Sequence, residues 1–244
     1  MRNHKLLQAV RGTSRPPWRV YNGCRLVSQP LSHDDANPSL RPLAKPHPWH
    51  GVSIGAGAPE IVTVFIEIVP TDTVKYEIDK ATGYLKIDRP QRFSNVSPTP
   101  YGFVPQTYCG PRVAQLAAAH TGRAQLAGDG DPLDICVITE KTIAHGNLLL
   151  EAIPIGGLRM LDKNEVDDKI LAVLKGDAAY GNWRDIGDCP DAFVQRIKHY
   201  FLTYKQSPQA AEPTCEITDI YDRGVAHDVI RRSQADYEEK FVKK

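Results

Sequence analysis

The chain has 244 residues and a net charge of +1; 41% of its residues are hydrophobic and 24% are charged. This length accommodates one well-buried core, and the composition is typical of a soluble globular protein. Residues 1–46 hold eight Lys or Arg and two acids, so the remainder, with 22 bases and 27 acids, is mildly acidic. An acidic body gives no reason to expect a nucleic acid as partner.

The cysteines and the hydropathy pattern indicate a cytoplasmic protein. The five cysteines show no C-x-x-C spacing, which predicts reduced thiols in a reducing compartment and excludes a disulfide framework. No apolar run reaches the roughly 18 residues that a membrane span needs, so no membrane partner is expected.

The first 46 residues predict a disordered, basic leader, because six prolines interrupt them and no hydrophobic period persists. No acid precedes Asp34, while Arg and Lys recur among Ser and Thr, which is typical of an organelle transit peptide. An over-long start or a tail without function fits the same residues, and these interpretations stay open. Ordered structure is expected over residues 47–244, as one domain.

Strand-like segments come first in the ordered part. Residues 74–78 alternate in character, so that Lys75 and Glu77 share one face, and turn residues after them predict a hairpin. The proline-rich stretch 90–105 is expected to be a long loop, and residues 109–128, rich in Ala, Gly and Gln, an exposed insertion. Strands are predicted at residues 62–69, 74–78, 84–88, 135–139, 148–155 and 170–174.

Two helices are predicted after the strands. Asp188 is expected to cap the first, with Pro190 in its first turn, and the second is expected to begin near Val225. Strands followed by helices in a compact chain predict a mainly β protein, a small barrel with helices packed outside. The expected buried stripes are Phe193, Ile197, Phe201 and Tyr204 in the first helix, and Val229, Ile230, Ser233, Tyr237 and Phe241 in the second.

The run Asp129-Gly130-Asp131-Pro132-Leu133-Asp134 is the sharpest signal for chemistry. Three carboxylates this close repel one another unless a cation lies among them. Oxygen donors without His or Cys select a hard ion such as Mg²⁺, Mn²⁺ or Ca²⁺. A calcium-binding EF-hand loop is excluded, because Leu133 and Asp134 occupy its fifth and sixth positions, where an oxygen donor and a glycine are required.

A second acidic group consists of Asp162, Asp167 and Asp168, followed by Lys169. Alone, such a segment is more often a charged turn than a site, but phosphate-binding groups elsewhere give it weight. No Ser-His-Asp set is recognisable, so direct attack of a metal-activated water on phosphorus is predicted rather than a covalent route. The candidate bases and phenols are Lys75, Arg89, Lys169, Lys205, Tyr101 and Tyr204.

The D-G-D-P-L-D-I run at 129–135 resembles the signature of the soluble family I inorganic pyrophosphatases. Further segments that match the family follow in the same order along the chain. The sequences of residues 47–51, 89–95 and 106–110 are most similar to its chlamydial-type bacterial branch. The resemblance implies a five-stranded OB-like barrel with flanking helices and an active site in the barrel mouth. The other matching segments are 65–68, 75–79, 88–89, 101–103, 162–169 and 199–205.

The resemblance implies hydrolysis of inorganic pyrophosphate to two phosphates by a Mg²⁺-activated water, in a homo-oligomer. It also implies several Mg²⁺ ions per site, with Mn²⁺ or Zn²⁺ as substitutes. Asp131 matches the residue that takes the proton from the water, and Asp167 is the other candidate for that role. The implied metal ligands are Glu67, Glu77, Asp129, Asp134, Asp162 and Asp167. The implied phosphate ligands are Lys75, Arg89, Tyr101, Lys169, Tyr204 and Lys205.

The chain departs from the family pattern in three places. Ser97 stands where the family often has a tyrosine, which would remove one phosphate or water contact. Lys163 follows Asp162 where an acid is common. The insertion 109–128 is longer than in many members and is expected to cover the site or to form a subunit contact. A catalytically weak phosphate- or metal-binding relative of the same fold is the alternative function, and Ser97 is its support.

Overall fold

The computed structural model describes residues 45–207 and 214–243, so the predicted leader lies outside the described residues except at its last two positions. None of the described helices has the length and apolar character needed to cross a membrane. The helices are α1 (Pro111–Thr121), α2 (Asp191–Thr203) and α3 (Arg223–Tyr237), with the short turns η2 (Ile186–Asp188) and η3 (Glu238–Val242). The strands are β1 (Val62–Ile68), β2 (Val74–Ile78), β3 (Leu85–Pro90), β4 (Tyr101–Phe103), β5 (Ala127–Gly128), β6 (Asp134–Ile138), β7 (Leu148–Asp162), β8 (Glu165–Val166), β9 (Lys169–Leu174) and β10 (Cys215–Asp222).

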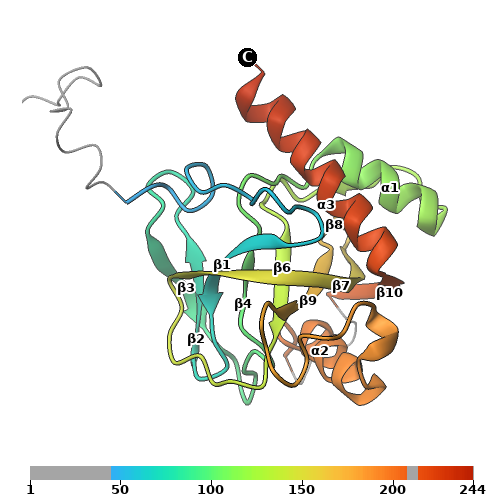
Figure 1. Cartoon of the computed structure of the whole chain (residues 1–244). Helices are drawn as coiled ribbons and strands as arrows, with labels where there is room; N and C mark the ends of the chain where they lie inside the picture. The colour runs from blue at the N-terminus through green and yellow to red at the C-terminus, as the bar shows by residue number, and fades with distance from the viewer. Residues whose placement is uncertain (1–44, 208–213, 244) are drawn as a thin grey trace, which may run out of the picture. The chain divides into compact units, whose positions relative to one another are not determined.

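Five strands pair in a closed ring, in the order β1, β4, β6, β9 and β7, and β7 returns to β1. The long strand β7 closes the ring because its first part pairs with β1 and its next part with β9, so that Ala152 lies opposite both Val62 and Leu174. The hairpin β2–β3 forms a separate two-stranded sheet (Figure 1). The predicted mainly β fold, a small five-stranded ring with flanking helices, is confirmed.

The central strands β6 and β9 are buried on both faces, which is why they read as continuous apolar runs. On β9, Ile170 belongs to the core cluster that contains Val229 of α3. The next residue, Leu171, points to the opposite face and belongs to the cluster that contains Ile197 and Phe201 of α2. The sheet therefore separates two cores, each covered by one of the predicted helices.

The prediction of one long loop over 90–105 is wrong at its end, where β4 inserts between β1 and β6. The backbones of β1 and β4 approach so closely that a Cβ at Gly102 would lie 1.9 Å from the carbonyl oxygen of Phe65. Only glycine permits this approach. The three-residue strand escapes prediction because its pairing depends on a distant partner and not on its own periodicity.

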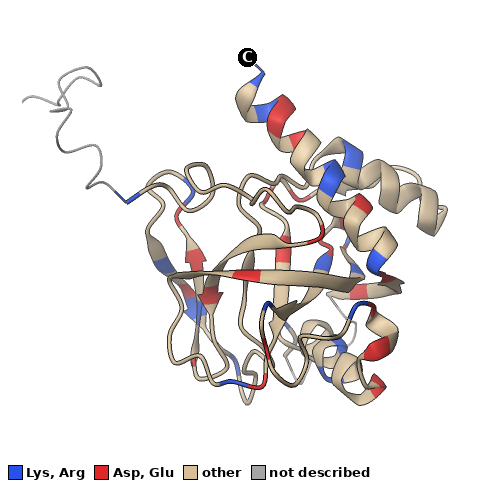
Figure 2. Cartoon of the chain, in the orientation of Figure 1, with Lys and Arg blue, Asp and Glu red and all other residues tan. Residues whose placement is uncertain are grey.

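The prediction of an exposed insertion over 109–128 is also wrong, since α1 lies there with Val113 and Ala117 fully buried. The buried carboxylate of Asp236 in α3 accepts hydrogen bonds from the backbone N–H groups of Arg112 (3.0 Å) and Val113 (3.3 Å). These bonds cap the first turn of α1, which has no cap of its own. Figure 2 shows α1 almost free of charge, as expected of a helix that packs against its neighbours.

The start of α2 differs from the prediction. Its N-cap is Pro190 and not Asp188. The Asp188 carboxylate instead accepts hydrogen bonds from the backbone N–H groups of Arg184 (2.7 Å) and Asp185 (3.1 Å), which stabilises the turn before the helix. Of the predicted stripe, Phe193 is only half-buried, because the burial of α2 is centred one residue later.

The second helix, α3, begins at Arg223, close to its predicted start. Asp222 is its N-cap and accepts a hydrogen bond from the backbone N–H of Val225 (2.9 Å). Phe241, the last residue of the predicted stripe, lies beyond α3 and is 39% exposed. The strand β10, which leads into Asp222, was not predicted; it pairs with β7 outside the ring and buries few of its side chains.

Candidate active site

A cleft of about 240 Å³ brings together eleven of the thirteen predicted site residues. The other two, Glu67 and Glu77, line a smaller cavity of about 70 Å³ that shares four residues with the cleft: Lys75, Tyr101, Asp131 and Asp134. The residues come from distant segments of the chain, so the fold assembles them. The eleven are Lys75, Arg89, Tyr101, Asp129, Asp131, Asp134, Asp162, Asp167, Lys169, Tyr204 and Lys205.

The centre of the cleft is a buried ammonium group between two carboxylates. Asp134 and Lys169 are the first residues of β6 and β9 and lie opposite each other in register. Lys169 is 1% exposed, and its Nζ donates to the carboxylates of both Asp134 and Asp167. The Tyr101 hydroxyl donates to the same oxygen of Asp134 at 2.5 Å. Every donor here is thus directed at a carboxylate oxygen.

The acidic bend before β6 is held by the backbone of Cys109. The N–H of Cys109 donates to the carbonyl of Asp131 (2.8 Å), and the N–H of Gly130 donates to the carbonyl of Cys109 (3.1 Å). Gly130 has φ 77°, in the region that favours glycine. Leu133 is fully buried and anchors the bend to the core. The acids of this bend are therefore positioned by rigid structure, as the sequence predicted.

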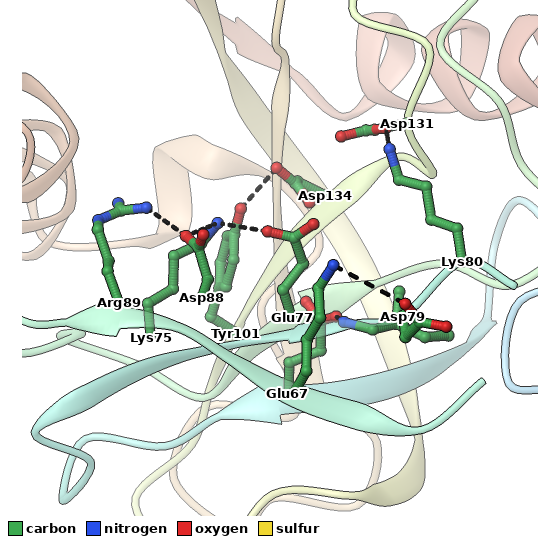
Figure 3. A network of polar contacts seen from close by, with 12 residues as sticks. Glu67, Lys75, Glu77, Asp79, Lys80, Asp88, Arg89, Tyr101, Asp131 and Asp134 are labelled. Carbon is green, nitrogen blue, oxygen red and sulfur yellow. Dashed lines mark hydrogen bonds and ion pairs between the residues drawn. The ribbon is translucent and has the colours of Figure 1, made fainter. Parts of the chain in front are cut away.

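The hairpin β2–β3 carries the charged side chains that face the bend (Figure 3). Lys75 Nζ lies 3.2 Å from carboxylate oxygens of both Glu77 and Asp88, and Arg89 also pairs with Asp88. From the hairpin turn, Lys80 forms an ion pair with Asp131. Neither Lys80 nor Asp88 is among the predicted site residues.

Glu67 is buried beneath the hairpin, with 6% of the residue exposed. Burial, together with the nearby charge of Asp134, raises the pKa of Glu67 to about 8. The opposing effect is a hydrogen bond of 2.7 Å from the backbone N–H of Ile78 to its carboxylate. Without a further cation, this side chain is neutral at pH 7.

Asp129 and Asp167 form a hydrogen-bonded carboxyl pair with unequal proton affinity. Burial, and then the charges of Asp167 and Asp134, raise the pKa of Asp129 to about 9. Burial also acts to raise the pKa of Asp167, but Lys169 and Lys205 hold it below its usual value. The lysines beside Asp167 are the reason why the two pKa values shift in opposite directions.

The donor set of the cleft fits a hard divalent cation. Six carboxylates and four basic side chains line the cleft, so the acids are in excess. Within residues 45–207 and 214–243, no three His, Cys, Asp or Glu side chains are arranged to hold a metal ion. Lysine ammonium groups contact the carboxylates of Asp131, Asp134 and Asp167. Burial is the largest cause of the raised pKa values of Glu67 and Asp129, and neighbouring carboxylates raise both pKa values further.

A second set of residues that line the cleft carries groups suited to phosphate oxygens. Lys205 Nζ lies 2.8 Å from a carboxylate oxygen of Asp162 and 5.4 Å from the centre of the Tyr204 ring. The Arg89 guanidinium lies 5.6 Å from the centre of the same ring. The Tyr204 ring thus sets the position of two cations that face the cleft.

Some residues that line the cleft were not predicted, and two features expected to affect the site do not line it. Tyr200 and Glu165 line it although neither was predicted; Tyr200 could have been found one helical turn before Tyr204. Ser97 is buried, donates to the carbonyl of Thr99 (2.6 Å) and does not line the cleft. No residue of α1 lines it either, so the predicted cover by the insertion is not found at this cleft.

Comparisons with known proteins agree with this geometry. The family model described as inorganic pyrophosphatase matches residues 64–238. An inorganic pyrophosphatase of Chlamydia trachomatis is 50% identical over 203 residues, which cover 82% of this chain and 97% of the relative. A soluble inorganic pyrophosphatase of Oryza sativa is 39% identical over 161 residues, which cover 66% of each chain. The crystal structure of the Thermus thermophilus inorganic pyrophosphatase superimposes with a TM-score of 0.64 at 32% identity, covering 77% of this chain and 97% of the other.

Proposed function

The chain belongs to the inorganic pyrophosphatase family, in its chlamydial-type branch, and hydrolyses inorganic pyrophosphate to two phosphates; we propose that one set of residues in the cleft, the acidic wall, binds metal ions and that another set, the basic wall, binds the phosphates. The acidic wall is the bend at Asp129–Asp134 with Asp162 and Asp167, and the basic wall is Lys75, Arg89 and Lys205. Lys169 donates to Asp134 and Asp167 of the acidic wall.

The acidic wall would hold several divalent cations, Mg²⁺ in the first place and Mn²⁺ or Zn²⁺ as substitutes. The ligands would be Asp129, Asp134, Asp162 and Asp167, with Glu67 and Glu77 reaching the site from the adjoining cavity. Such ions supply a water of lowered pKa and neutralise phosphate charge. Excess carboxylate in a cleft with oxygen donors only is the observation that supports this assignment.

The basic wall would bind the two phosphoryl groups. Lys75, Arg89, Lys169 and Lys205 supply positive charge where the transferring and leaving phosphates gain negative charge, and Tyr101 and Tyr204 add hydroxyl donors. Phosphoryl transfer needs positioning and electrostatic stabilisation more than covalent chemistry, so this set is sufficient.

Asp131 is the proposed acceptor of the proton from the attacking water. Its side chain is 43% exposed at the rim of the cleft and pairs with Lys80, so it can exchange protons with solvent. The other candidate, Asp167, is 15% exposed and is held by Lys169. Each candidate pairs with a lysine, so the greater exposure of Asp131 is what favours it over Asp167 as the group that accepts and releases the proton.

The observation that carries the proposal is the convergence of six acids and four bases on one cleft of about 240 Å³. The test is phosphate release from pyrophosphate with Mg²⁺, compared with the same protein in excess chelator. We expect turnover that depends on the metal. Binding of pyrophosphate without phosphate release would instead favour the alternative function, a catalytically weak relative of the same fold, for which Ser97 is the support.

Two variants separate the candidate bases. Asp131→Asn should lower turnover by about 10²–10⁴-fold while the Mg²⁺ affinity, measured by calorimetry, stays nearly unchanged. Asp167→Asn should weaken Mg²⁺ binding as well as turnover. A near-wild-type rate of the Asp131→Asn protein would show that Asp131 is not the base.

We further propose that the chain works in the cytoplasm as a homo-oligomer. The four cysteines within the described residues are buried and unpaired, which suits a reducing compartment. On the hairpin β2–β3 and the loop after it, Tyr84, Ile87 and Phe93 are each more than 60% exposed, which suits a contact between copies. Light scattering of the purified protein, at several concentrations, tests the second point.

A further inference from the structure

A buried ion pair lies behind the active-site cleft, and none of the roles proposed above uses it. The side chains of Arg159 in β7 and Asp168 just before β9 are both 0% exposed. Arg159 Nε donates to one carboxylate oxygen of Asp168 at 3.2 Å, and its Nη2 donates to the other at 2.9 Å. This two-pronged contact fixes the orientation of the carboxylate.

Tyr221 of β10 is the third member of this buried unit. Its hydroxyl donates to Asp168 at 3.2 Å, and the Arg159 guanidinium lies 5.2 Å from the centre of its ring. The ring occupies the space beside Gly157, where a Cβ would lie 2.4 Å from a ring carbon. Gly157 and Tyr221 are partners in register, so the missing side chain lets the phenol reach across β7 toward Asp168.

Asp168 lies between two residues of the cleft. Successive side chains of an extended segment point to opposite faces. Asp167 and Lys169 line the cleft, and Asp168 points away from it into the buried unit. The same segment is tied to β7 by the hydrogen bond from the Asp167 N–H to the carbonyl of Met160 (2.9 Å). Fixing Asp168 therefore fixes the backbone from which Asp167 and Lys169 project.

Stability alone does not explain charges at this place. Both ions of a fully buried pair lose their hydration, which costs free energy. An apolar pair of similar volume is therefore often as stabilising as the ion pair. Nη1 of Arg159 is also buried with no hydrogen-bond partner within the described part of the chain, which adds to the cost. What an apolar pair could not supply is the directional bond to Asp168.

We propose that Arg159, Asp168 and Tyr221 form a positioning unit that holds Asp167 and Lys169 in the geometry required for metal and phosphate binding. The proposal rests on the function proposed for the cleft and adds three residues that do not touch substrate. Because small displacements of reacting groups cost large factors in rate, loss of the unit lowers kcat by about 10–100-fold.

The test compares single and paired replacements in the full-length protein. Asp168→Asn leaves Arg159 buried and unpaired, so it lowers both stability and kcat. The double variant Arg159→Met with Asp168→Val removes both charges; it regains stability in urea denaturation but keeps the low kcat. Tyr221→Phe, which removes one hydrogen bond, lowers kcat by about twofold to fivefold. Calorimetry without substrate shows Mg²⁺ affinity at least tenfold weaker in the double variant.

The matched control is Asp236→Asn. Asp236 is likewise a buried carboxylate paired with an arginine, Arg112, but it caps α1 and does not line the cleft. Its replacement lowers stability and leaves kcat and Mg²⁺ affinity within about twofold of wild type.

Recovery of wild-type kcat and Mg²⁺ affinity in the double variant would overturn the proposal, as would an equal loss of both in the control. If the folded wild-type protein releases no phosphate, the proposed function fails, and the calorimetric comparison still decides whether the unit positions Asp167.

Discussion

The buried carboxyl of Glu67 predicts how the stability of the metal-free protein depends on pH. Its pKa is about 8 in the folded protein, against 4.5 for an ordinary glutamate, with burial as the largest cause. Between these values the folded state binds a proton that the unfolded state lacks. The free energy of unfolding therefore falls as pH rises through this window. At about 1.4 kcal/mol per pH unit, the loss is on the order of 4 kcal/mol.

Glu67→Gln removes this contribution, because the amide stays neutral and its oxygen can still accept the bond from Ile78. We expect urea denaturation in chelator to show a variant that is more stable than wild type near pH 8 and nearly equal to it near pH 5. Glu151→Gln, at an exposed position on β7, is the matched control and should follow wild type at every pH. Asp129, whose pKa is raised to about 9, acts in the same direction, so part of the slope should remain in the variant.

Saturating Mg²⁺ should reduce the slope in wild type, since a cation among the carboxylates favours their ionised forms. The reasoning is refuted if the metal-free wild-type protein has a flat stability profile from pH 5 to pH 8, or if Glu67→Gln leaves the slope unchanged.

Three further substitutions test separate parts of the structure. Arg89→Lys should raise the KM for pyrophosphate about tenfold with little change in urea stability, because an ammonium group cannot reproduce the two-pronged contact of a guanidinium with phosphate. Gly102→Ala should lower the free energy of unfolding by about 3 kcal/mol or more, measured by urea denaturation, since its Cβ would lie 1.9 Å from a backbone oxygen. Lys80→Ala should change that free energy by less than about 1 kcal/mol, because its ion pair with Asp131 is nearly half exposed.

Three of the predicted strands share one property: they are buried, and the β-branched side chains within each segment indicate this. The strands β1, β6 and β9 are of this kind. The missed elements are stabilised from elsewhere. The strand β4 depends on the absence of a side chain at Gly102, and the cap of α1 comes from Asp236, 124 residues away from Arg112. Neither β1, the partner of β4, nor Asp236, the cap of α1, can be recognised as a partner from the sequence of the missed segment itself.

The same distinction holds in the active site. The clustered acids Asp129, Asp131 and Asp134 show their chemistry in the sequence, because so much like charge in one bend needs a cation. Lys80 has no such signal: a lysine in a hairpin turn is common, and only the folded hairpin brings it to Asp131. Asp168 belongs to the predicted acidic group with Asp162 and Asp167, but its side chain points away from the cleft that the other two line. Sequence spacing does not show to which face a side chain of an extended segment points unless the strand is already known.

Carboxylates that look equivalent in the sequence differ in their exposure and in their partners in the folded protein. Asp134 is 22% exposed, and Lys169 and Tyr101 both donate to one of its carboxylate oxygens, so a metal ion that binds this oxygen has to displace the ammonium group. Asp131, three residues earlier and 43% exposed, can exchange protons with solvent. An ammonium group displaced from Asp134 would need another anion as partner, and a phosphoryl group bound in the cleft would supply one. In this scheme Lys169 would pair with carboxylates before the metal and substrate bind and with phosphate afterwards, which would couple metal binding and substrate binding through one buried charge.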